Sequence, residues 1–287
     1  MNIRLIARLD IKGPNLVKGI HLEGLRVLGK PEKFARHYYE SGADELLYMD
    51  AVASLYGRNS LLHIIKKTAR EIFIPLTVGG GLRSIEDIRT VLRAGADKVA
   101  INTAAINRPE LIREASRAFG SSTIVVSIEA IKKTDGTYEA YTDYGREKTG
   151  INAYEWALQA VELGAGELMG TSIDREGTGK GFDRELTRQI AEMVPIPVIA
   201  SGGAGTMDHI REVITEGKAE AASLASILHY HAVKHCEFNN EDYDAEGNIE
   251  FLRRQAKFSK IQATGLRNIK EFLLDKGIDI CHLGNLN

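Results

Sequence analysis

The stretch IPLTVGGG at 74–81 recurs in similar form as IPVIASGG at 196–203, which lies 122 residues further along the chain. Each copy is a short apolar run that ends in small residues and glycines, a pattern typical of a buried parallel strand followed by a tight turn. The same offset of 122 residues separates GADEL (42–46) from GAGEL (164–168), and GADK (95–98) from GKAE (217–220). We therefore expect two halves of similar structure in one chain.

Apolar runs of strand length alternate along the chain with amphipathic segments of helix length. The expected strands cover 5–9, 45–50, 75–78, 98–102, 124–129, 167–172, 197–201 and 221–225. The expected helices cover 33–41, 61–71, 85–94, 109–119, 153–163, 183–193, 207–215 and 266–275. This alternation predicts βαβ units, and eight strands favour an α/β fold, a closed (β/α)8 TIM barrel built from two duplicated half-barrels.

The halves are not separated by a linker rich in Ser or Pro, so residues 1–287 are expected to form a single barrel domain. A polar insertion at about 234–260 is expected to separate the eighth strand from the eighth helix, at 266–275. The segment 12–31 after the first strand is expected to be a long loop, of the kind that often forms a lid. The polar stretch 134–149 resembles a hairpin.

Composition limits the class of protein. Of the 287 residues, 44% are hydrophobic and 26% are charged, which is globular composition and excludes a disordered, fibrous or disulfide-scaffold chain. The net charge of -2 disfavours a nucleic-acid-binding protein. The charged N-terminus and the lack of a long apolar run predict neither a signal peptide nor a membrane span. Because Cys236 and Cys281 lack metal spacing, a reduced, cytoplasmic protein is expected.

Two carboxylates occupy matching strand ends, where barrels of this kind place their active sites. Asp10 ends the first expected strand and Glu129 the fifth, so we expect both to face one cavity. Carboxyl groups that share such a site can separate their pKa values into an acid and a base. A helix cap or a salt bridge is the structural alternative for each. Asp10→Asn is expected to abolish turnover with little loss of stability. Asp50 and Asp174 form a second pair, for substrate orientation or for structural bracing.

The glycines after the third and seventh strands favour anion binding, because backbone N–H groups there can approach a phosphate closely. Helix N-termini that follow the fourth and eighth strands would add further donors. A substrate with a phosphate at each end is implied, while tight turns alone are the alternative. Lys18 is expected either to reach a phosphate or to remain solvated. One site is expected from Gly81, Asn102 and Thr103, the other from Gly177, Gly203, Ala225 and Ser226.

Charged residues also stand at strand starts, namely Arg4, Glu45, Lys98 and Glu167. They would surround the barrel axis at its N-terminal end, where unpaired charges are costly. A plug of salt bridges and a gate to an axial passage are both open interpretations. The histidines at 229, 231 and 235 are interpreted as polar surface, and no metal site is expected.

Longer motifs resemble the cyclase subunit of imidazole glycerol phosphate synthase, a family of histidine biosynthesis. The similarity runs almost continuously from 5 to 230. Its most specific parts are LVKG (16–19), IPLTVGGGLRS (74–84), RAGADKVAINTAA (93–105), TSIDREGTGKGFD (171–183) and IPVIASGGAG (196–205).

The resemblance implies a duplicated (β/α)8 barrel that takes ammonia from a separate glutaminase subunit docked on its N-terminal face. The ring of Arg4, Glu45, Lys98 and Glu167 would be the ammonia gate. The implied substrate is the bisphosphorylated phosphoribulosyl-formimino aminoimidazole carboxamide ribonucleotide. The implied products are imidazole glycerol phosphate and aminoimidazole carboxamide ribonucleotide, and no metal or organic cofactor is implied. Asp10 and Glu129 would be the catalytic pair. The implied substrate-binding residues are Lys18, Asp174, Glu176 and those of the two phosphate sites.

The chain departs from the family pattern at several points. Glu129 stands where the family has aspartate, and its extra methylene moves the carboxylate by roughly an ångström, enough to cost ~10²-fold in rate. Glu176 also replaces an aspartate. Arg8 replaces a small inward residue, and is expected to narrow the mouth, to pair with Glu129 or to block the ammonia path. The insertion at 234–260 is the fourth departure.

These departures keep other functions open. A paralogue that delivers glutaminase-derived ammonia to another acceptor, such as a sugar of a surface polysaccharide, is the main alternative. A non-catalytic barrel that only scaffolds a glutaminase would make Asp10 and Glu129 dispensable. The related isomerase of the same pathway shares the strand-end carboxyls, but the ring of charges favours the ammonia-using enzyme.

Overall fold

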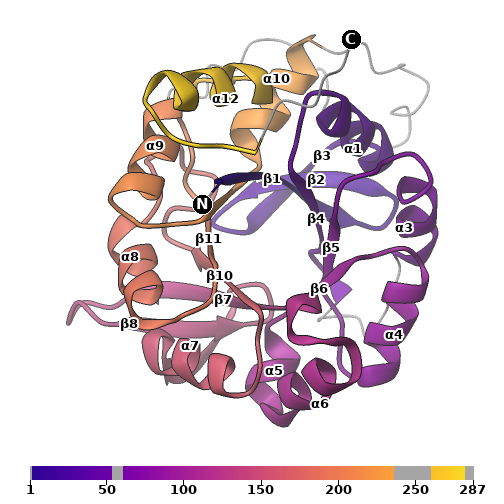
Figure 1. Ribbon diagram of the computed structural model, residues 1–287, viewed down its shortest axis with the longest axis vertical. Coiled ribbons are helices and arrows are strands. Elements are labelled where there is room, and N and C mark those ends of the chain that lie inside the picture. Colours follow the sequence, from indigo (N-terminus) through magenta and orange to yellow (C-terminus); the bar gives the residue numbers. More distant parts are fainter. Residues whose placement is uncertain (1, 54–60, 236–259, 282–287) are drawn as a thin grey trace.

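Eight parallel strands close into a barrel in the computed structural model, which describes residues 2–53, 61–235 and 260–281. The strand order is β1-β4-β5-β6-β7-β10-β11-β12, and β12 pairs back onto β1. Figure 1 shows these strands in the middle of the molecule and the helices around them. The predicted (β/α)8 barrel is therefore confirmed. The strands are β1 Arg4–Lys12, β4 Glu45–Asp50, β5 Leu76–Gly79, β6 Lys98–Ile101, β7 Ile124–Lys132, β10 Glu167–Ser172, β11 Val198–Ser201 and β12 Ala221–Leu224.

The outer helices begin where the sequence supplies polar caps. Ser84, Asn152, Asp183 and Thr206 each accept a hydrogen bond from a backbone N–H group in the first turn of the helix that follows. Such caps satisfy N–H groups that have no partner within the helix. The helices are α1 Pro31–Glu40, α3 Leu62–Thr68, α4 Ile85–Arg93, α5 Thr103–Asn107, α6 Glu110–Phe119, α7 Ala153–Glu162, α8 Arg184–Met193, α9 Met207–Thr215, α10 Ser226–His235 and α12 Leu266–Asp275.

Each half carries a hairpin after its first barrel strand. Residues 12–31, expected as a loop, instead contain β2 (Asn15–Ile20) and β3 (Glu23–Gly29). The loop prediction was wrong because β2 pairs with β1 in antiparallel register, with Val17 opposite Asp10, and its apolar residues Leu16 and Val17 are buried. The matching hairpin, β8 (Tyr138–Thr142) and β9 (Glu147–Asn152), extends β7 and agrees with the hairpin expected at 134–149.

The eighth strand is followed directly by a helix. β12 leads at once into α10, whose residues Ile227, Leu228 and Ala232 are buried. The insertion expected at about 234–260 begins only where α10 ends, so it stays a prediction. Most of the predicted insertion, residues 236–259 with Cys236, lies outside the described residues.

Among the described residues, apolar side chains form a large cluster between the strands and helices and a separate cluster inside the barrel. The inner group forms a layer across the barrel, between the charged strand starts and the strand ends. Its members are Ile6, Leu47, Met49, Ala100, Val125, Met169, Ile199 and Ala221. Within the described ranges, no helix is both long and apolar enough to cross a membrane.

A buried lysine fastens the last helix to the first half of the barrel. Lys270 on α12 is 0% exposed, and its ammonium donates to Asp44 Oδ1 at 2.6 Å and to the Cys281 carbonyl oxygen at 3.1 Å. Asp44 in turn accepts a hydrogen bond from the backbone N–H of Leu5 at the start of β1. This contact, here called the Lys270 clasp, compensates the buried charge of the lysine with a carboxylate.

Candidate active site at the C-terminal ends of the strands

Asp10 and Glu129 are buried near the C-terminal ends of β1 and β7, with 1% and 3% of their surface exposed. Glu129 lines the larger of two cavities at this end of the barrel and accepts a hydrogen bond from Asn102 Nδ2 at 3.1 Å. Among the described residues, Asp10 lines neither of the two cavities. That both carboxylates face one cavity therefore stays a prediction.

The two carboxyl groups differ in their proton affinity. Burial raises the pKa of Glu129 to about 7, against the opposing effect of the nearby Arg8 cation. Burial alone would also raise the pKa of Asp10, but Arg8 and Lys18 outweigh it and hold that pKa below its ordinary value. Near neutral pH, one group therefore remains a carboxylate while the other exchanges a proton, as an acid–base pair requires.

Arg8 is a fully buried cation beside Asp10. Its Nε donates to Asp10 Oδ1 at 2.9 Å, and its Nη1 donates to Ser201 Oγ at 3.1 Å. The expected pairing with Glu129 is wrong, because Asp10 on the same strand, two residues away, holds the guanidinium. The same cation acts on Glu129 only at longer range, through its charge.

Lys18 is buried rather than solvated. Its ammonium donates to Glu176 Oε1 and lies 3.6 Å from Asp10 Oδ2. Burial opposes its charge, but Glu176 and Asp10 outweigh that effect and raise the pKa of Lys18. The interpretation as a solvated lysine is therefore wrong. The hairpin of β2 and β3 carries this side chain inward instead of leaving it on a loop.

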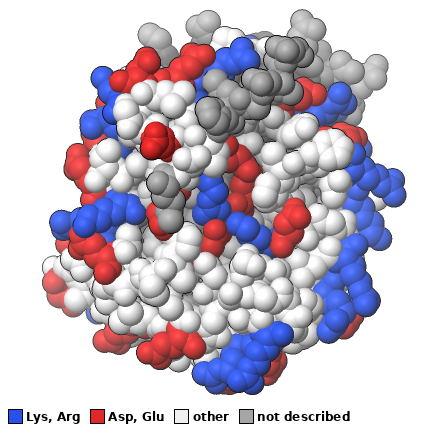
Figure 2. Space-filling view, in the orientation of Figure 1, with Lys and Arg blue, Asp and Glu red and all other residues white. Residues whose placement is uncertain are grey.

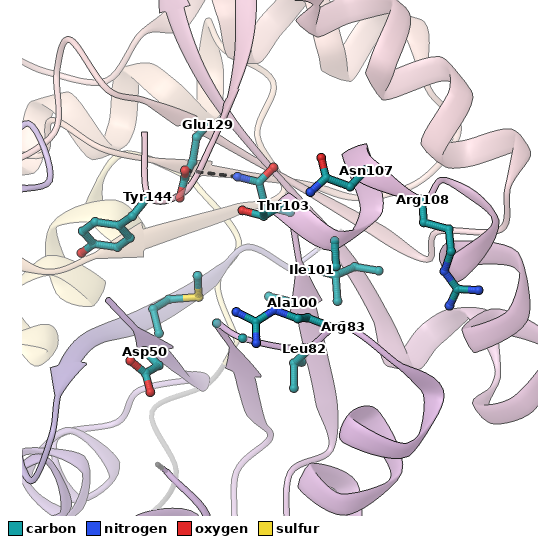
Figure 3. Close-up of a pocket in the computed structure, with 15 residues that line it drawn as sticks. Asp50, Leu82, Arg83, Ala100, Ile101, Thr103, Asn107, Arg108, Glu129 and Tyr144 are labelled. Carbon is teal, nitrogen blue, oxygen red and sulfur yellow. Dashed lines mark hydrogen bonds between the residues drawn. The ribbon is translucent and has the colours of Figure 1, made fainter. Parts of the chain in front are cut away.

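The larger cavity, of about 970 Å³, brings together the residues of the first predicted phosphate site (Figure 3). Gly80, which lines it between β5 and α4, has a φ of +97°, and a Cβ there would stand 2.5 Å from the Asp50 carbonyl oxygen, so only glycine fits. Other lining residues are Asp50, Gly81, Arg83, Asn102, Thr103, Asn107, Arg108, Glu129 and Tyr144.

The smaller cavity, of about 280 Å³, brings together the residues of the second predicted phosphate site. Gly203 has a φ of +110°, and a Cβ there would stand 2.2 Å from the Gly181 carbonyl oxygen. The close approach of these two backbones explains the glycine, and α10 begins at the same cavity. The lining residues are Arg8, Glu176, Gly177, Ser201, Gly202, Gly203, Ala204, Ser223, Ala225 and Ser226.

Asp50 and Asp174 do not form a symmetric pair. Asp50 lines the larger cavity, and its Oδ1 accepts from the backbone N–H of Val52 at 3.1 Å. Asp174 is exposed, and its Oδ2 accepts a hydrogen bond from the backbone N–H of Lys132 at 3.0 Å. It is absent from the described residues that line the two cavities. Its position is that of a brace between β10 and the end of β7.

Tyr144 is a site residue that the sequence did not reveal. Asp143 and Tyr144 form the turn between β8 and β9 with positive φ angles of 51° and 59°. This turn directs Tyr144 into the larger cavity, where Figure 3 shows it on the same side as Glu129. Burial raises the pKa of Tyr144 well above its ordinary value, so its hydroxyl remains protonated. The sequence signal was the turn residue Gly145, which does not reveal the direction of the preceding side chain.

Sequence reasoning also missed Arg83, Asn107 and Arg108, whose polar side chains line the same cavity.

The four charges at the strand starts form a closed ring. Arg4 lies 3.0 Å from Glu45 and 2.8 Å from Glu167, and Lys98 lies 3.2 Å and 3.0 Å from the same two carboxylates. Figure 2 shows side chains of both charges at the centre of this face. Each cation thus bridges two anions, which compensates their partial burial. The geometry agrees with a salt-bridge plug and leaves a gating role as a prediction.

The histidines of α10 have structural contacts. His229 Nδ1 lies 2.6 Å from the Tyr38 hydroxyl, and burial lowers the pKa of His229 to about 3. The rings of His231 and His235 are tilted by 36°, with their centroids 4.4 Å apart. The interpretation as polar surface is wrong for His229, which is 0% exposed. Within residues 2–53, 61–235 and 260–281, no group of three or more His, Cys, Asp or Glu side chains is placed to hold a metal ion.

Comparison with known proteins gives consistent matches. The family described as "Histidine biosynthesis protein" matches residues 4–234. A Legionella pneumophila protein named imidazole glycerol phosphate synthase subunit HisF is 60% identical over 207 residues, which cover 72% of this chain and 98% of the relative. Relatives of the same name from Trichormus variabilis and a Nostoc species are 48% and 47% identical. They cover 83% and 85% of this chain, and 93% and 95% of their own length.

Proposed function

Because the chain belongs to the histidine biosynthesis protein family, we propose that it is the cyclase subunit of imidazole glycerol phosphate synthase, the name that its relatives carry. The reaction joins ammonia to phosphoribulosyl-formimino aminoimidazole carboxamide ribonucleotide. It yields imidazole glycerol phosphate and aminoimidazole carboxamide ribonucleotide. The observation that carries this proposal is the buried carboxylate pair, Asp10 and Glu129, placed among two glycine-lined cavities.

The reaction needs groups that move protons. When ammonia becomes a ring nitrogen it must lose protons, while the oxygen that leaves as water and the amine that is released must gain them. Glu129, with a pKa of about 7, can give and take a proton near neutral pH. Asp10, held as an anion by Arg8 and Lys18, stabilises positive charge that develops on nitrogen.

The two cavities account for a substrate with a phosphate at each end. We assign one phosphate to the larger cavity, with Gly81, Asn102 and Thr103, and the other to the smaller cavity, with Gly203 and Ser226. Gly177 and Ala225 complete the second site. We place the chemistry in the larger cavity because Glu129 lines it.

A glutaminase is the proposed partner, on the face where the strands begin. Phe73, which precedes β5 at this end of the barrel, is 83% exposed and lines a surface cavity with Pro75 and Asp97. An exposed aromatic beside a pocket is typical of a protein–protein contact. Ammonia released there would enter at the charged ring of Arg4, Glu45, Lys98 and Glu167.

A turnover assay tests the proposed reaction. The chain alone, supplied with the bisphosphorylated substrate and an ammonium salt, is expected to form imidazole glycerol phosphate and aminoimidazole carboxamide ribonucleotide in equal amounts. The assay follows both products by chromatography. A folded but inactive protein would overturn the proposal and favour another ammonia acceptor.

Replacing Lys98 by alanine is expected to separate the two sources of nitrogen. Free ammonia can enter from the open mouth, so ammonia-dependent turnover should stay near the wild-type rate. Glutamine-dependent turnover with the cognate glutaminase should fall, because Glu45 and Glu167 lose a shared cation at the entrance. Lys98→Arg, which keeps the charge, is the matched control. Equal losses in both assays would show that the ring is only structural.

A further inference from the structure

Arg8 lines the smaller cavity, and one nitrogen of its guanidinium group has no hydrogen-bond partner among the described residues. Two of its nitrogens are held by Asp10 and Ser201, but Nη2 is buried and has no hydrogen-bond partner among the described residues. Arg8 is 2% exposed and lines the cavity itself. A buried guanidinium N–H without an acceptor is costly, so this nitrogen is suited to an acceptor that arrives with a ligand.

Other donors surround the same space. The Ser223 hydroxyl is buried, lines the cavity and also has no partner among the residues that the structure describes. The first turn of α10, a helix of ten residues that begins at Ser226, adds backbone N–H groups and the positive end of the helix dipole.

One carboxylate also borders the cavity among the described residues, that of Glu176. Its Oε1 accepts from the buried ammonium of Lys18, which compensates its charge. The remaining charged side chain of the lining is Arg8, so the polar groups left for a ligand are predominantly donors. The cavity is small and lined by glycine and serine residues, which suits a phosphate group.

We propose that Arg8 is a substrate-binding residue of the smaller cavity, where its Nη2 donates to an oxygen of a phosphomonoester while its Nε holds Asp10. This inference rests on the proposed function for the identity of the substrate, but the anion site itself does not. Arg8 thereby links two parts of the site, because the guanidinium that contacts the phosphate also orients Asp10. The planar guanidinium fixes the angle between its donors, so the contact to the phosphate and the contact to Asp10 are held in one geometry.

Phosphate binding to the free chain tests the proposal without any turnover. Inorganic phosphate is titrated into isotope-labelled protein, and the backbone amide signals of Gly203 and Ser226 report the smaller cavity. The signals of Gly81 and Thr103 report the larger one. Arg8→Gln is expected to weaken phosphate binding at Gly203 and Ser226 by about 10- to 100-fold. The matched control Arg83→Gln, in the larger cavity, should leave that affinity unchanged.

A second variant guards against a folding defect, since Arg8→Gln leaves Asp10 without its main partner. Arg8→Gln/Asp10→Asn removes both charges of the pair and is expected to show the same loss of phosphate affinity in a folded protein. Wild-type affinity at Gly203 and Ser226 in either folded variant would overturn the role of Arg8. If phosphate binds there in an Arg8-dependent way while the wild-type chain fails the turnover assay, the proposed function alone is wrong.

Discussion

Replacing Glu129 by glutamine is expected to lower kcat for ammonia-dependent turnover by ~10²–10⁴-fold. The amide keeps the size and the hydrogen bond to Asn102 but cannot exchange the proton that the carboxyl group carries near neutral pH. Steady-state kinetics with saturating ammonium salt measure the effect. Glu147→Gln, on the exposed edge of β9, is the control and should be indistinguishable from wild type. A Glu129→Gln variant with more than about a tenth of the wild-type kcat would contradict a role in proton transfer.

The same variant has a second readout that does not depend on activity. Burial raises the pKa of Glu129 from about 4.5 to about 7, so the folded state binds a proton that the unfolded state has released over this pH interval. The stability from the neutral form is therefore complete below about pH 4.5 and is lost as the pH rises through 7. Relative to Glu129→Gln, the wild-type free energy of unfolding should fall by up to about 3 kcal/mol between these values. Denaturant titrations at several pH values measure it, and a flat difference would show that burial does not raise this pKa.

Asp10→Asn is expected to reduce both turnover and stability. The sequence predicted a stable, inactive variant, but Asp10 is buried between Arg8 and Lys18. In the variant, these two cations would share Glu176 as their remaining close anion among the described residues. Breaking one partner of a buried ion pair costs about 3–5 kcal/mol in free energy of unfolding. Urea denaturation measures the loss, and the exposed Asp174→Asn is the control.

A double variant separates the two effects of Asp10. Arg8→Gln/Asp10→Asn removes both charges, so most of the lost stability should return while turnover stays low. An Asp10→Asn protein as stable as wild type would mean that the ion pair with Arg8 contributes little to folding.

The barrel was predictable because its signals are local. Each strand is an apolar run that ends near a glycine or a polar residue, and each helix has a periodic apolar face. The ring of Arg4, Glu45, Lys98 and Glu167 was also predictable, because strand starts in a closed barrel converge on one end. The glycines of both cavities followed from the repeat of 122 residues.

The partners of the buried charges were not predictable. Whether Arg8 reaches Asp10 or Glu129 depends on side-chain rotamers and on the twist of β1, and the sequence encodes neither directly. Lys18 was placed on a loop because its strand pairs with β1 through backbone contacts that leave only a weak pattern. Tyr144 enters the site through a turn with positive φ angles, which the sequence signals through glycine but not through tyrosine.

The Lys270 clasp has a consequence for protein synthesis. Asp44 is synthesised 226 residues before Lys270. The strand β1 is likewise synthesised long before its partner β12. A nascent chain that stalls before Leu266 therefore presents an unfastened barrel, and until β12 is made the edge of β1 stays open to other chains. Chains truncated before α12 are therefore expected to be less stable than the full chain and more readily cleaved by proteases.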